Sequence, residues 1–349
     1  MALIELRKKI DAIDDRILAA LEDRMSLVKE IGAIKKKDSG TIYRPAREKE
    51  ILSRLGAHKG LLARSAIEAI FREIFAASRQ LEQEERVAFL GPEGSFSHQA
   101  AESRFGATSE YLPMQTIGAV FKAVESRRAK YGVAPISNNL SGLVGDTIDC
   151  LEKSDLLIVG DMELSIHHSF ATKAEHLAKI KRVYSKDVAF GQCRAFFSDH
   201  NLSVEMIPVE STAKAARLAA DDAESAAICS VIAAKLNELP VMFENIEDSH
   251  DNRTRFAIVS DFHNSASRRD LTTILARTPH KPGALFALLK EFNDAQINLT
   301  MIESIPSHIS KNQTLFFIDF EGHRDDPAIK AILDGRKNEI KWLGSYARN

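Results

Sequence analysis

Apolar residues recur every third or fourth position along the first part of the chain, from Leu3 to about Lys37. This spacing predicts one long amphipathic helix with an apolar stripe on a single face. The stripe comprises Leu6, Ile10, Ile13, Ile17, Leu21, Met25, Val28, Ile31 and Ile34. A helix longer than about 25 residues is unusual in a globular domain unless its stripe packs against a partner. We therefore expect a helical dimer.

Two shorter helices are predicted next. Pro45, at a first-turn position, opens one helix that ends at Gly56, and the other runs from about Ala63 to Glu82. The second has one apolar face, formed by Ile67, Ile70, Phe71, Ile74 and Phe75. Residues 1–85 are thus expected to form an all-helical domain.

The pattern changes at Arg86, where short apolar strands begin to alternate with helices. The strand candidates are Val87–Leu90, Tyr131–Ile136, Leu156–Val159, Lys181–Tyr184, Ala226–Cys229 and Phe256–Val259. This alternation predicts an α/β domain over residues 86–262, which can divide into two lobes.

A polar link from His263 to Asp270 precedes the last part of the chain. There the pattern reads strand, helix opened by Pro282, strand, strand, helix from Pro327 to Gly335, and strand. This order predicts an α+β, ferredoxin-like βαββαβ domain over residues 271–349.

The composition, with 44% hydrophobic and 28% charged residues and a formal net charge of -2, is typical of a soluble globular protein. It provides no sequence-wide attraction for nucleic acid. No run approaches the roughly 20 apolar residues of a membrane helix, and the amphipathic N-terminus is unlike a signal peptide, so we expect a cytoplasmic location. Cys150, Cys193 and Cys229 have no metal or redox spacing, and we expect them to be reduced.

Basic residues on the long helix are candidates for binding an anion. Arg24 and Lys35 lie on nearly the same stripe, whereas Arg7 is about 25 Å from Arg24 along the axis. In an antiparallel or crossed dimer, Arg7 of one chain reaches the stripe of the other, which creates two equivalent pockets by symmetry. The alternative is that these are ordinary solvated charges on a helix face.

A set of dispersed motifs in residues 1–85 resembles the all-helical chorismate mutases. The motifs are Leu6-Arg7-x-x-Ile10-Asp11-x-Ile13-Asp14, Arg24, Gly32-x-x-Lys35, Tyr43-x-Pro45-x-Arg47-Glu48, Ser78 and Glu82. The resemblance implies that Arg7 from the partner chain joins Arg24, Arg47 and Ser78 in binding the substrate. It also implies that Lys35 contacts the ether oxygen and that Glu48 binds the ring hydroxyl.

Glu82 occupies the position where many of these enzymes have a glutamine facing the ether oxygen. A carboxyl group donates a hydrogen bond only when protonated. We therefore expect mutase activity to favour mildly acidic pH.

The segment Gly91–His98 places Ser95 and Ser97 between a predicted strand and a helix N-terminus, where free N–H groups attract anions. It lacks the Gly-Lys-Ser/Thr ending of a nucleotide-binding loop. The alternative is that one of these serines only caps the helix.

Motifs spread over residues 86–262 resemble the prephenate dehydratases. They are Gly91-Pro92-x-Gly94-Ser95-Phe96-Ser97, Gly132-Val133-Ala134-Pro135-Ile136, Asn138, Gly142, His168, Val183-Tyr184-Ser185, Gln192-Cys193, Ser211-Thr212 and Thr254-Arg255-Phe256. The resemblance implies a two-lobed fold like that of periplasmic binding proteins, with Thr254 as proton donor and no metal or organic cofactor. The implied pocket residues are Ser95, Ser97, Asn138, His168, Gln192 and Arg255.

Ser137 stands where relatives usually have a glutamate. This difference motivates an alternative hypothesis, in which the chain is a chorismate mutase fused to a noncatalytic, ligand-sensing body.

The segment Lys281–Phe286 and the later Ile302-Glu303-Ser304 resemble the ACT domain that follows such dehydratases. The resemblance implies phenylalanine binding between two copies and feedback inhibition. The implied effector residues are Gly283, Ala284, Leu285, Glu303 and Ser304. Relatives commonly have an arginine at the position of Ile305, and a dimerisation module that senses nothing is the alternative.

The three resemblances together predict a bifunctional enzyme of phenylalanine biosynthesis that converts chorismate to prephenate and then to phenylpyruvate. The expected partners are these substrates, phenylalanine as effector, and a second copy of the chain in a homodimer or larger homo-oligomer.

Overall fold

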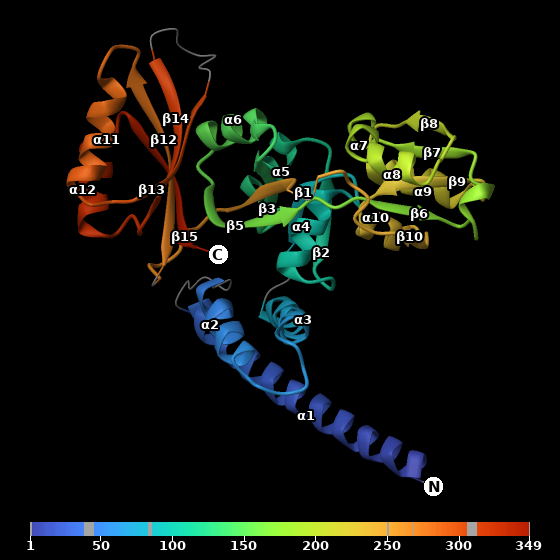
Figure 1. The fold of residues 1–349 in the computed structure, drawn as a ribbon. Coiled ribbons are helices and arrows are strands. Elements are labelled where there is room, and N and C mark those ends of the chain that lie inside the picture. The colour runs from blue at the N-terminus through green and yellow to red at the C-terminus, as the bar shows by residue number, and fades with distance from the viewer. Residues whose placement is uncertain are drawn as a thin grey trace. The chain divides into compact units, whose positions relative to one another are not determined.

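The computed structural model describes residues 2–37, 45–82, 86–249, 251–267, 269–305 and 313–348. It contains two compact units, of which one comprises the three N-terminal helices with Phe105–Glu110, and the other comprises the remaining α/β part (Figure 1). The helices are α1 (Ala2–Lys37), α2 (Pro45–Gly56) and α3 (Arg64–Glu82). The expected all-helical N-terminal part is therefore confirmed.

The helical unit buries only part of its apolar surface. Val28 of α1 and Ile67, Phe75 and Ala76 of α3 are buried. The N-terminal half of α1 stays open, because its apolar side chains are about half exposed. These are Leu6 at 56%, Ile10 at 56%, Ile13 at 50% and Ile17 at 54%. A single chain thus leaves the N-terminal half of the predicted stripe uncovered.

The second unit begins with a sheet of order β2-β1-β3-β11-β5, which we call the first lobe. Its strands are β1 (Arg86–Leu90), β2 (Glu110–Met114), β3 (Tyr131–Asn138), β4 (Gly142–Leu143, paired with β3), β5 (Leu157–Ser165) and β11 (Arg253–Ser260). Its helices are α4 (Phe96–Phe105), α5 (Ile117–Glu125) and α6 (Gly145–Lys153). Strand β11 runs antiparallel to both neighbours. Strand β11, although it is the last of these strands in the sequence, therefore lies in the interior of the sheet.

The second lobe is a sheet of order β10-β6-β9-β7-β8. Its strands are β6 (Ser169–Thr172), β7 (Arg182–Ser185), β8 (Glu205–Pro208), β9 (Ser225–Cys229) and β10 (Val241–Phe243). Its helices are η1 (Leu177–Lys179), α7 (Asp187–Gln192), α8 (Arg194–Asp199), α9 (Thr212–Ala220) and α10 (Val231–Leu236). Alanines of α9 and α10 pack on β9, and small side chains allow this close approach.

Two connections join the lobes, one after β5 and one before β11. They pair with each other, because the Ile166 N–H donates to the Asn252 carbonyl at 2.8 Å and the Ile246 N–H donates to the His168 carbonyl at 3.0 Å. The chain therefore leaves and re-enters the first lobe side by side, as expected for a two-lobed fold.

The third sheet has the order β13-β14-β12-β15 with every neighbouring pair antiparallel. Its elements are β12 (Asp270–Pro279), α11 (Ala284–Asp294), β13 (Leu299–Ile305), β14 (Gln313–Glu321), α12 (Pro327–Gly335) and β15 (Ile340–Ala347). This order is the predicted βαββαβ arrangement. Helices α11 and α12 cover one face, as Figure 1 shows, and bury Phe292 and Phe320.

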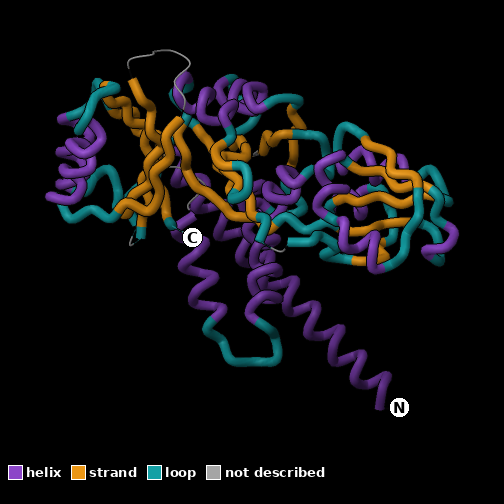
Figure 2. Tube along the Cα trace, turned by 45° about the horizontal axis from the view of Figure 1, so that its top comes forward, coloured by secondary structure: helices purple, strands orange, loops and turns teal. Residues whose placement is uncertain are grey.

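The other face of the third sheet packs on the first lobe (Figure 2). Leu275, Phe317 and Leu343 share one buried cluster with Ala257 and Val259 of β11. The backbones of β15 and β5 approach so closely that a Cβ on Gly344 would lie 2.1 Å from the carbonyl oxygen of Ile158. The first lobe and the C-terminal sheet thus share a core.

Candidate functional site

Two adjacent residues of α3 contact the predicted mutase groups of α1 and α2. Arg24 donates to the Ser78 hydroxyl at 2.5 Å, and its guanidinium lies 5.8 Å from the centre of the Phe75 ring. Ser78 in turn donates to the Ile74 carbonyl at 2.6 Å. The serine hydrogen is therefore used within the helix, while its oxygen accepts from Arg24.

Glu48 forms an ion pair with Arg79, and the two side chains are only 14% and 8% exposed. Arg79 also donates to the Phe105 carbonyl at 2.7 Å. Arg79 is part of none of the sequence motifs described above. Its position next to Ser78, on a helix face rich in apolar residues, could have indicated burial. A buried arginine requires an acidic partner.

Arg7 and Arg47, the other predicted mutase groups whose side chains are described, do not join these contacts. Arg7 lies on the exposed half of α1. Arg47 pairs with Glu50 at 2.7 Å on the surface, with both side chains more than 60% exposed. The side chains of Lys35 and Glu82 lie outside the described residues. Arg24, Ser78 and Glu48 thus form only part of the expected set.

Thr254 and Asn138 meet across the β11–β3 pair, where they are direct cross-strand neighbours. The Asn138 side-chain nitrogen donates to the Thr254 hydroxyl oxygen at 2.9 Å. The amide orientation is set by the following turn, because the Asn138 oxygen accepts from the N–H groups of Leu140 at 3.0 Å and Ser141 at 3.2 Å. With a donor on its oxygen, the threonine can direct its own hydrogen elsewhere.

Asn252, which the sequence analysis missed, supports this pair. Its side-chain oxygen accepts from the Asn138 nitrogen at 2.8 Å, and Asn252 is buried in the connection between the lobes. The amide of Asn138 is thus held from the connection as well as from its own turn.

Ser95 acts as a helix cap. Its hydroxyl accepts from the His98 N–H at 3.2 Å and donates to the Leu90 carbonyl at 3.0 Å. Ser97 is buried at the start of α4. The capping interpretation of Ser95 therefore has direct geometric support.

The same loop is attached to the second lobe through Gly94. Ser230 at the start of α10 donates to the Gly94 carbonyl at 2.7 Å, and the Gly94 N–H donates to His98 Nδ1 at 3.1 Å. A Cβ on Gly94 would lie 3.0 Å from the Ala233 Cα, and its φ of +81° also favours glycine. This glycine lets the loop of one lobe touch a helix of the other.

His168 and Gln192 form a second predicted pair. His168 Nε2 lies 2.9 Å from the Gln192 side-chain oxygen, and the His168 ring lies edge-on to Phe96 at 5.6 Å. Burial lowers the pKa of His168, although its bond to Gln192 acts in the opposite direction. The ring is therefore neutral near pH 7. Within the described part of the chain, the buried Nδ1 has no hydrogen-bond partner.

Glu247 fixes the connection that carries His168. Its carboxylate accepts from the His168 N–H at 2.8 Å and lies 2.6 Å from His167 Nδ1, while its side chain is only 3% exposed. Asp248 caps α8 by accepting from the N–H groups of Arg194 at 3.1 Å and Ala195 at 2.9 Å. The sequence analysis identified neither acid, because their partners come from distant segments.

Arg255 points away from Thr254, because successive side chains of a strand lie on opposite faces. Its guanidinium contacts Asp161 at 2.8 Å, Asp319 at 2.5 Å and the Tyr346 hydroxyl at 2.8 Å. Ser137 is the direct cross-strand partner of Arg255, so it lies on the same face. The structure thus places Arg255 against the C-terminal sheet rather than beside the Thr254 hydroxyl.

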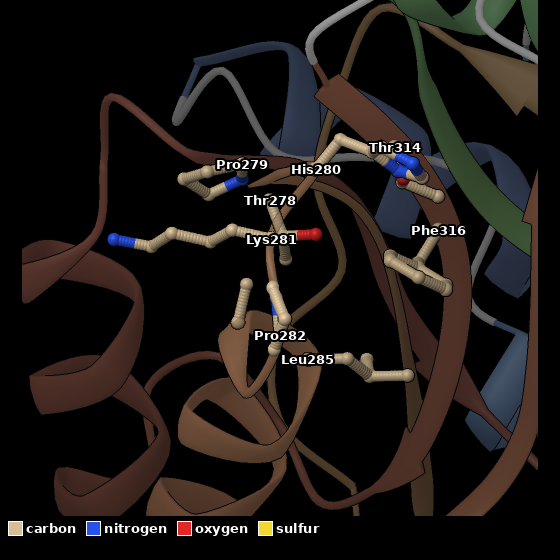
Figure 3. A pocket seen from close by; sticks show the side chains of 9 residues that line it. Thr278, Pro279, His280, Lys281, Pro282, Leu285, Thr314 and Phe316 are labelled. Carbon is tan, nitrogen blue, oxygen red and sulfur yellow. The ribbon is translucent and has the colours of Figure 1, made fainter.

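A cavity of about 330 Å³ opens at the N-terminus of α11, between the end of β12 and the start of β14. Figure 3 shows the side chains around it, with Leu285 on the helix and Thr314 and Phe316 on β14. Gly283 caps the helix with a φ of 81°. Ala284 and Leu285 line the cavity, whereas Glu303 and Ser304 of β13 do not. One chain therefore brings together only part of the predicted effector set.

The described residues contain no group of three or more His, Cys, Asp or Glu side chains that could hold a metal ion. The three cysteines are free. Burial raises the pKa of Cys193 and Cys229 to about 12, so both are protonated thiols. Over the described ranges, no helix has the length and apolarity needed to cross a membrane.

Three family models match the chain in sequence order. A chorismate mutase type II model matches residues 6–83, a prephenate dehydratase model matches residues 87–264, and an ACT domain model matches residues 272–336. The matches follow the order of the helical part, the two lobes and the C-terminal sheet.

Curated relatives match over almost their whole length. The bifunctional chorismate mutase/prephenate dehydratase of Aquifex aeolicus is 38% identical over 99% of this chain and 98% of the relative. The enzyme of the same name from Pseudomonas aeruginosa is 37% identical over 98% of this chain and 97% of the relative.

Solved structures match the two lobes and the C-terminal sheet. Prephenate dehydratase from Arthrobacter aurescens in complex with L-Phe has a TM-score of 0.67 and 31% identity, covering 75% of this chain and 90% of that chain. A protein described as a quorum quenching acylase, GqqA, has a TM-score of 0.68 and 30% identity, covering 76% and 98%.

Proposed function

Because the chain belongs to the family of bifunctional chorismate mutase/prephenate dehydratases, we propose that its residues divide between two active sites and one effector site. The enzyme rearranges chorismate to prephenate, and then dehydrates and decarboxylates prephenate to phenylpyruvate for phenylalanine biosynthesis. The geometric observation that carries the dehydratase assignment is the hydrogen bond from Asn138 to Thr254.

The mutase site is completed by a second copy of the chain. The exposed apolar half of α1 supports this proposal, since large exposed apolar surfaces mark interaction sites. Arg7 lies on that half and enters the partner's site, where it joins Arg24, Ser78 and Arg47 in binding the two substrate carboxylates. The minimal active species is therefore a homodimer.

Chorismate rearranges without a covalent enzyme intermediate, so the protein must hold the reactive conformer and stabilise charge on the breaking ether oxygen. Lys35 and a protonated Glu82 donate to that oxygen, and Glu48 accepts from the ring hydroxyl. The ion pair with Arg79 holds the Glu48 carboxylate in place, where its side chain is only 14% exposed.

The dehydratase reaction requires a proton for the departing hydroxyl. Thr254 donates it, and the electron pair of the bond to the departing carboxylate completes the aromatic ring. Water and carbon dioxide leave together with phenylpyruvate. The Asn138 N–H, already bonded to the Thr254 oxygen, stabilises that oxygen until solvent returns a proton to it.

Substrate binds between the lobes, beside the connections that carry His168 and precede Thr254. The unpaired Nδ1 of the neutral His168 supports a role in accepting a substrate hydrogen bond. Gln192 holds the ring, Ser97 lies at the start of α4, and Ser95 positions the loop by capping that helix.

Ser137 is compatible with an active dehydratase. Its pairing with Arg255 puts it on the sheet face opposite the Thr254 hydroxyl, so the carboxylate common in relatives is not needed beside the proton donor. This observation favours an active dehydratase domain over the alternative, in which the mutase is fused to a noncatalytic sensor.

Phenylalanine binds at the N-terminus of α11 and lowers dehydratase turnover. The positive end of the helix dipole, at Gly283 and Ala284, suits its carboxylate, and Leu285 with Phe316 suits its ring. Glu303 and Ser304 come from a second copy, which completes the site between two C-terminal sheets. The free cysteines also favour a reducing, cytoplasmic location.

The decisive experiment supplies the purified protein separately with chorismate and with prephenate, and follows phenylpyruvate with and without phenylalanine. We expect phenylpyruvate from both substrates and less of it when phenylalanine is present. Accumulation of prephenate without phenylpyruvate would instead show a mutase attached to a noncatalytic sensor.

A further inference from the structure

We propose that Arg255 is a positioning residue for Thr254, through which the C-terminal sheet sets the rate of the dehydratase. The proposal rests on the dehydratase and effector functions proposed above. It assigns to the guanidinium a role away from substrate, on the opposite face of the strand that carries the proton donor.

The Arg255 guanidinium donates hydrogen bonds to both sides of the interface between the first lobe and the C-terminal sheet. Nε donates to Asp161 of the neighbouring strand β5 at 2.8 Å. Nη1 donates to Asp319 of β14 at 2.5 Å, and Nη2 donates to the Tyr346 hydroxyl of β15 at 2.8 Å. Two of these three contacts with oxygen atoms therefore come from the C-terminal sheet, and one comes from the first lobe.

The partners in the C-terminal sheet are hydrogen-bonded to one another and buried. Thr273 of β12 donates to the other oxygen of Asp319 at 2.6 Å and shares a hydrogen bond with the Tyr346 hydroxyl at 2.8 Å. The side chain of Asp319 is 2% exposed, and Thr273 and Tyr346 are fully buried. Arg255 thus contacts a buried polar cluster formed by three strands.

Breaking the ion pairs of Arg255 with Asp161 and Asp319 is energetically costly. Asp161 and Asp319 are two carboxylates that face one guanidinium with a side chain only 15% exposed. An unpaired buried charge is costly, so a shift of the C-terminal sheet must either carry Arg255 along or leave a carboxylate without its partner. The neighbouring tyrosine hydroxyl is protonated, because burial raises its pKa well above the usual value.

The second observation is the place of Arg255 in β11. Thr254 precedes it directly, and the hydrogen bond of Thr254 to Asn138 is made on the opposite face of the strand. The pairing of β11 with β3 changes register immediately after Arg255. A displacement of the guanidinium is therefore transmitted through one peptide unit to the Thr254 hydroxyl.

The third observation connects this network to the effector cavity. Thr278 of β12 and Phe316 of β14 line the cavity, and the same two strands carry Thr273 and Asp319. A ligand that shifts either strand acts on the partners of Arg255. No further relay is required between the effector site and the proton donor.

A second ion pair across the same interface provides a matched control. Arg277 of β12 donates to Glu152 of α6 at 2.5 Å, also between the C-terminal sheet and the first lobe. Among the described residues, it makes no hydrogen bond or ion pair with β11. If Arg255 only held the two parts together, loss of either ion pair would have a similar effect on the dehydratase.

The test compares Asp319→Asn, Tyr346→Phe and Arg277→Gln with the native full-length enzyme. Dehydratase kcat and KM are measured with prephenate, inhibition is measured with phenylalanine, and phenylalanine binding is measured by calorimetry. Emission from Trp342, the single tryptophan of the chain, checks that the C-terminal sheet is folded. Tyr346→Phe keeps shape and burial, so it remains informative where Asp319→Asn fails to fold.

We expect kcat to fall about tenfold in Asp319→Asn and about threefold in Tyr346→Phe, with KM within about twofold of native. Maximal inhibition by phenylalanine should weaken in both variants while binding persists. Arg277→Gln should keep native kcat and inhibition. Arg255→Lys should also lose kcat, because a single ammonium cannot reproduce the three-way contact.

An unchanged kcat in both Asp319→Asn and Tyr346→Phe, or an equal loss in Arg277→Gln, would overturn the proposal. Native enzyme that forms no phenylpyruvate from prephenate would overturn the proposed dehydratase function, and this proposal with it. Native turnover that phenylalanine does not affect would overturn only the effector part, because the kcat comparison among variants still tests the positioning of Thr254.

Discussion

The helical part and the first lobe differ in how much of an active site one chain provides. In α1 the apolar side chains of Leu6, Ile10 and Ile13 remain about half exposed, and Arg7 lies far from Arg24. In the first lobe, β11 is paired on both sides, and Asn138 already holds Thr254. A single long helix cannot bury its own stripe, whereas an interior strand is complete within its sheet.

Removing the proton donor is the most direct test of whether the first lobe of one chain carries the dehydratase site. Thr254→Val keeps the shape but removes the hydroxyl, so dehydratase kcat should fall by about 10²- to 10⁴-fold with mutase activity unchanged. Prephenate turnover is measured alongside chorismate turnover. Thr254→Ser, which restores a hydroxyl, should recover much of the rate, and full activity of the valine variant would refute the assignment.

Loss of the ether-oxygen donor is the corresponding test in the helical part. Lys35→Ala should lower mutase kcat by about 10²- to 10³-fold, because it removes charge stabilisation on the breaking bond. Prephenate formation from chorismate is the measurement. Lys29→Ala, at an exposed position of the same helix, serves as control. A normal rate for the Lys35 variant would show that the mutase site lies elsewhere.

A charge in the apolar stripe tests the need for a second copy. Ile13→Asp should raise the dissociation constant of the dimer about tenfold, which corresponds to about 1.4 kcal/mol of association free energy, and should lower mutase activity at low protein concentration. Dehydratase activity should change much less. Both rates are followed on dilution, with Lys9→Asp as a charged control. Equal dilution profiles for the two activities would contradict the comparison.

The two activities should also differ in their dependence on pH, although by a smaller factor than in the variants above. Glu82 donates only when protonated, so mutase activity should rise about two- to fivefold from pH 8 to about pH 6. The dehydratase should lose activity in acid, since burial lowers the pKa of His168 below 6.5 and the site uses its neutral ring. Initial rates across this range provide the measurement.

The sign of the His168 effect follows from its lowered pKa. The folded protein resists protonation of this ring, so the associated stability is fully present above pH 6.5 and is lost as the pH falls through the lowered value. Glu82→Gln should flatten the mutase profile and leave the dehydratase profile unchanged. Parallel profiles for both native activities would count against these roles.

Much of the fold could be predicted because apolar periodicity reflects local geometry. The predicted helices coincide with α1 and α2 at Lys37, Pro45 and Gly56, and the βαββαβ order of the last domain is confirmed. Patterns with periods of 3.6 and 2 depend only on which face each element buries. They contain no information about which residues of different elements meet.

The site residues show this limit most clearly at Thr254 and Arg255. The motif that contains both was recognisable, but strand alternation and the packing of a third sheet decide that one faces Asn138 and the other faces Asp319. The same reason applies to three residues that the sequence could not identify, because each contacts a residue far away in sequence. They are Arg79, Asn252 and Glu247.

The sequence by itself determined the elements, their order and the families that the motifs resemble, because these depend on local spacing and residue type. Only the tertiary structure decided that Ser95 caps a helix, that Ser137 lies on the Arg255 face, and that the stripe of α1 stays open in one chain. Hydrogen bonds and buried ion pairs need atoms within about 3 Å of each other, and long-range packing alone sets those distances.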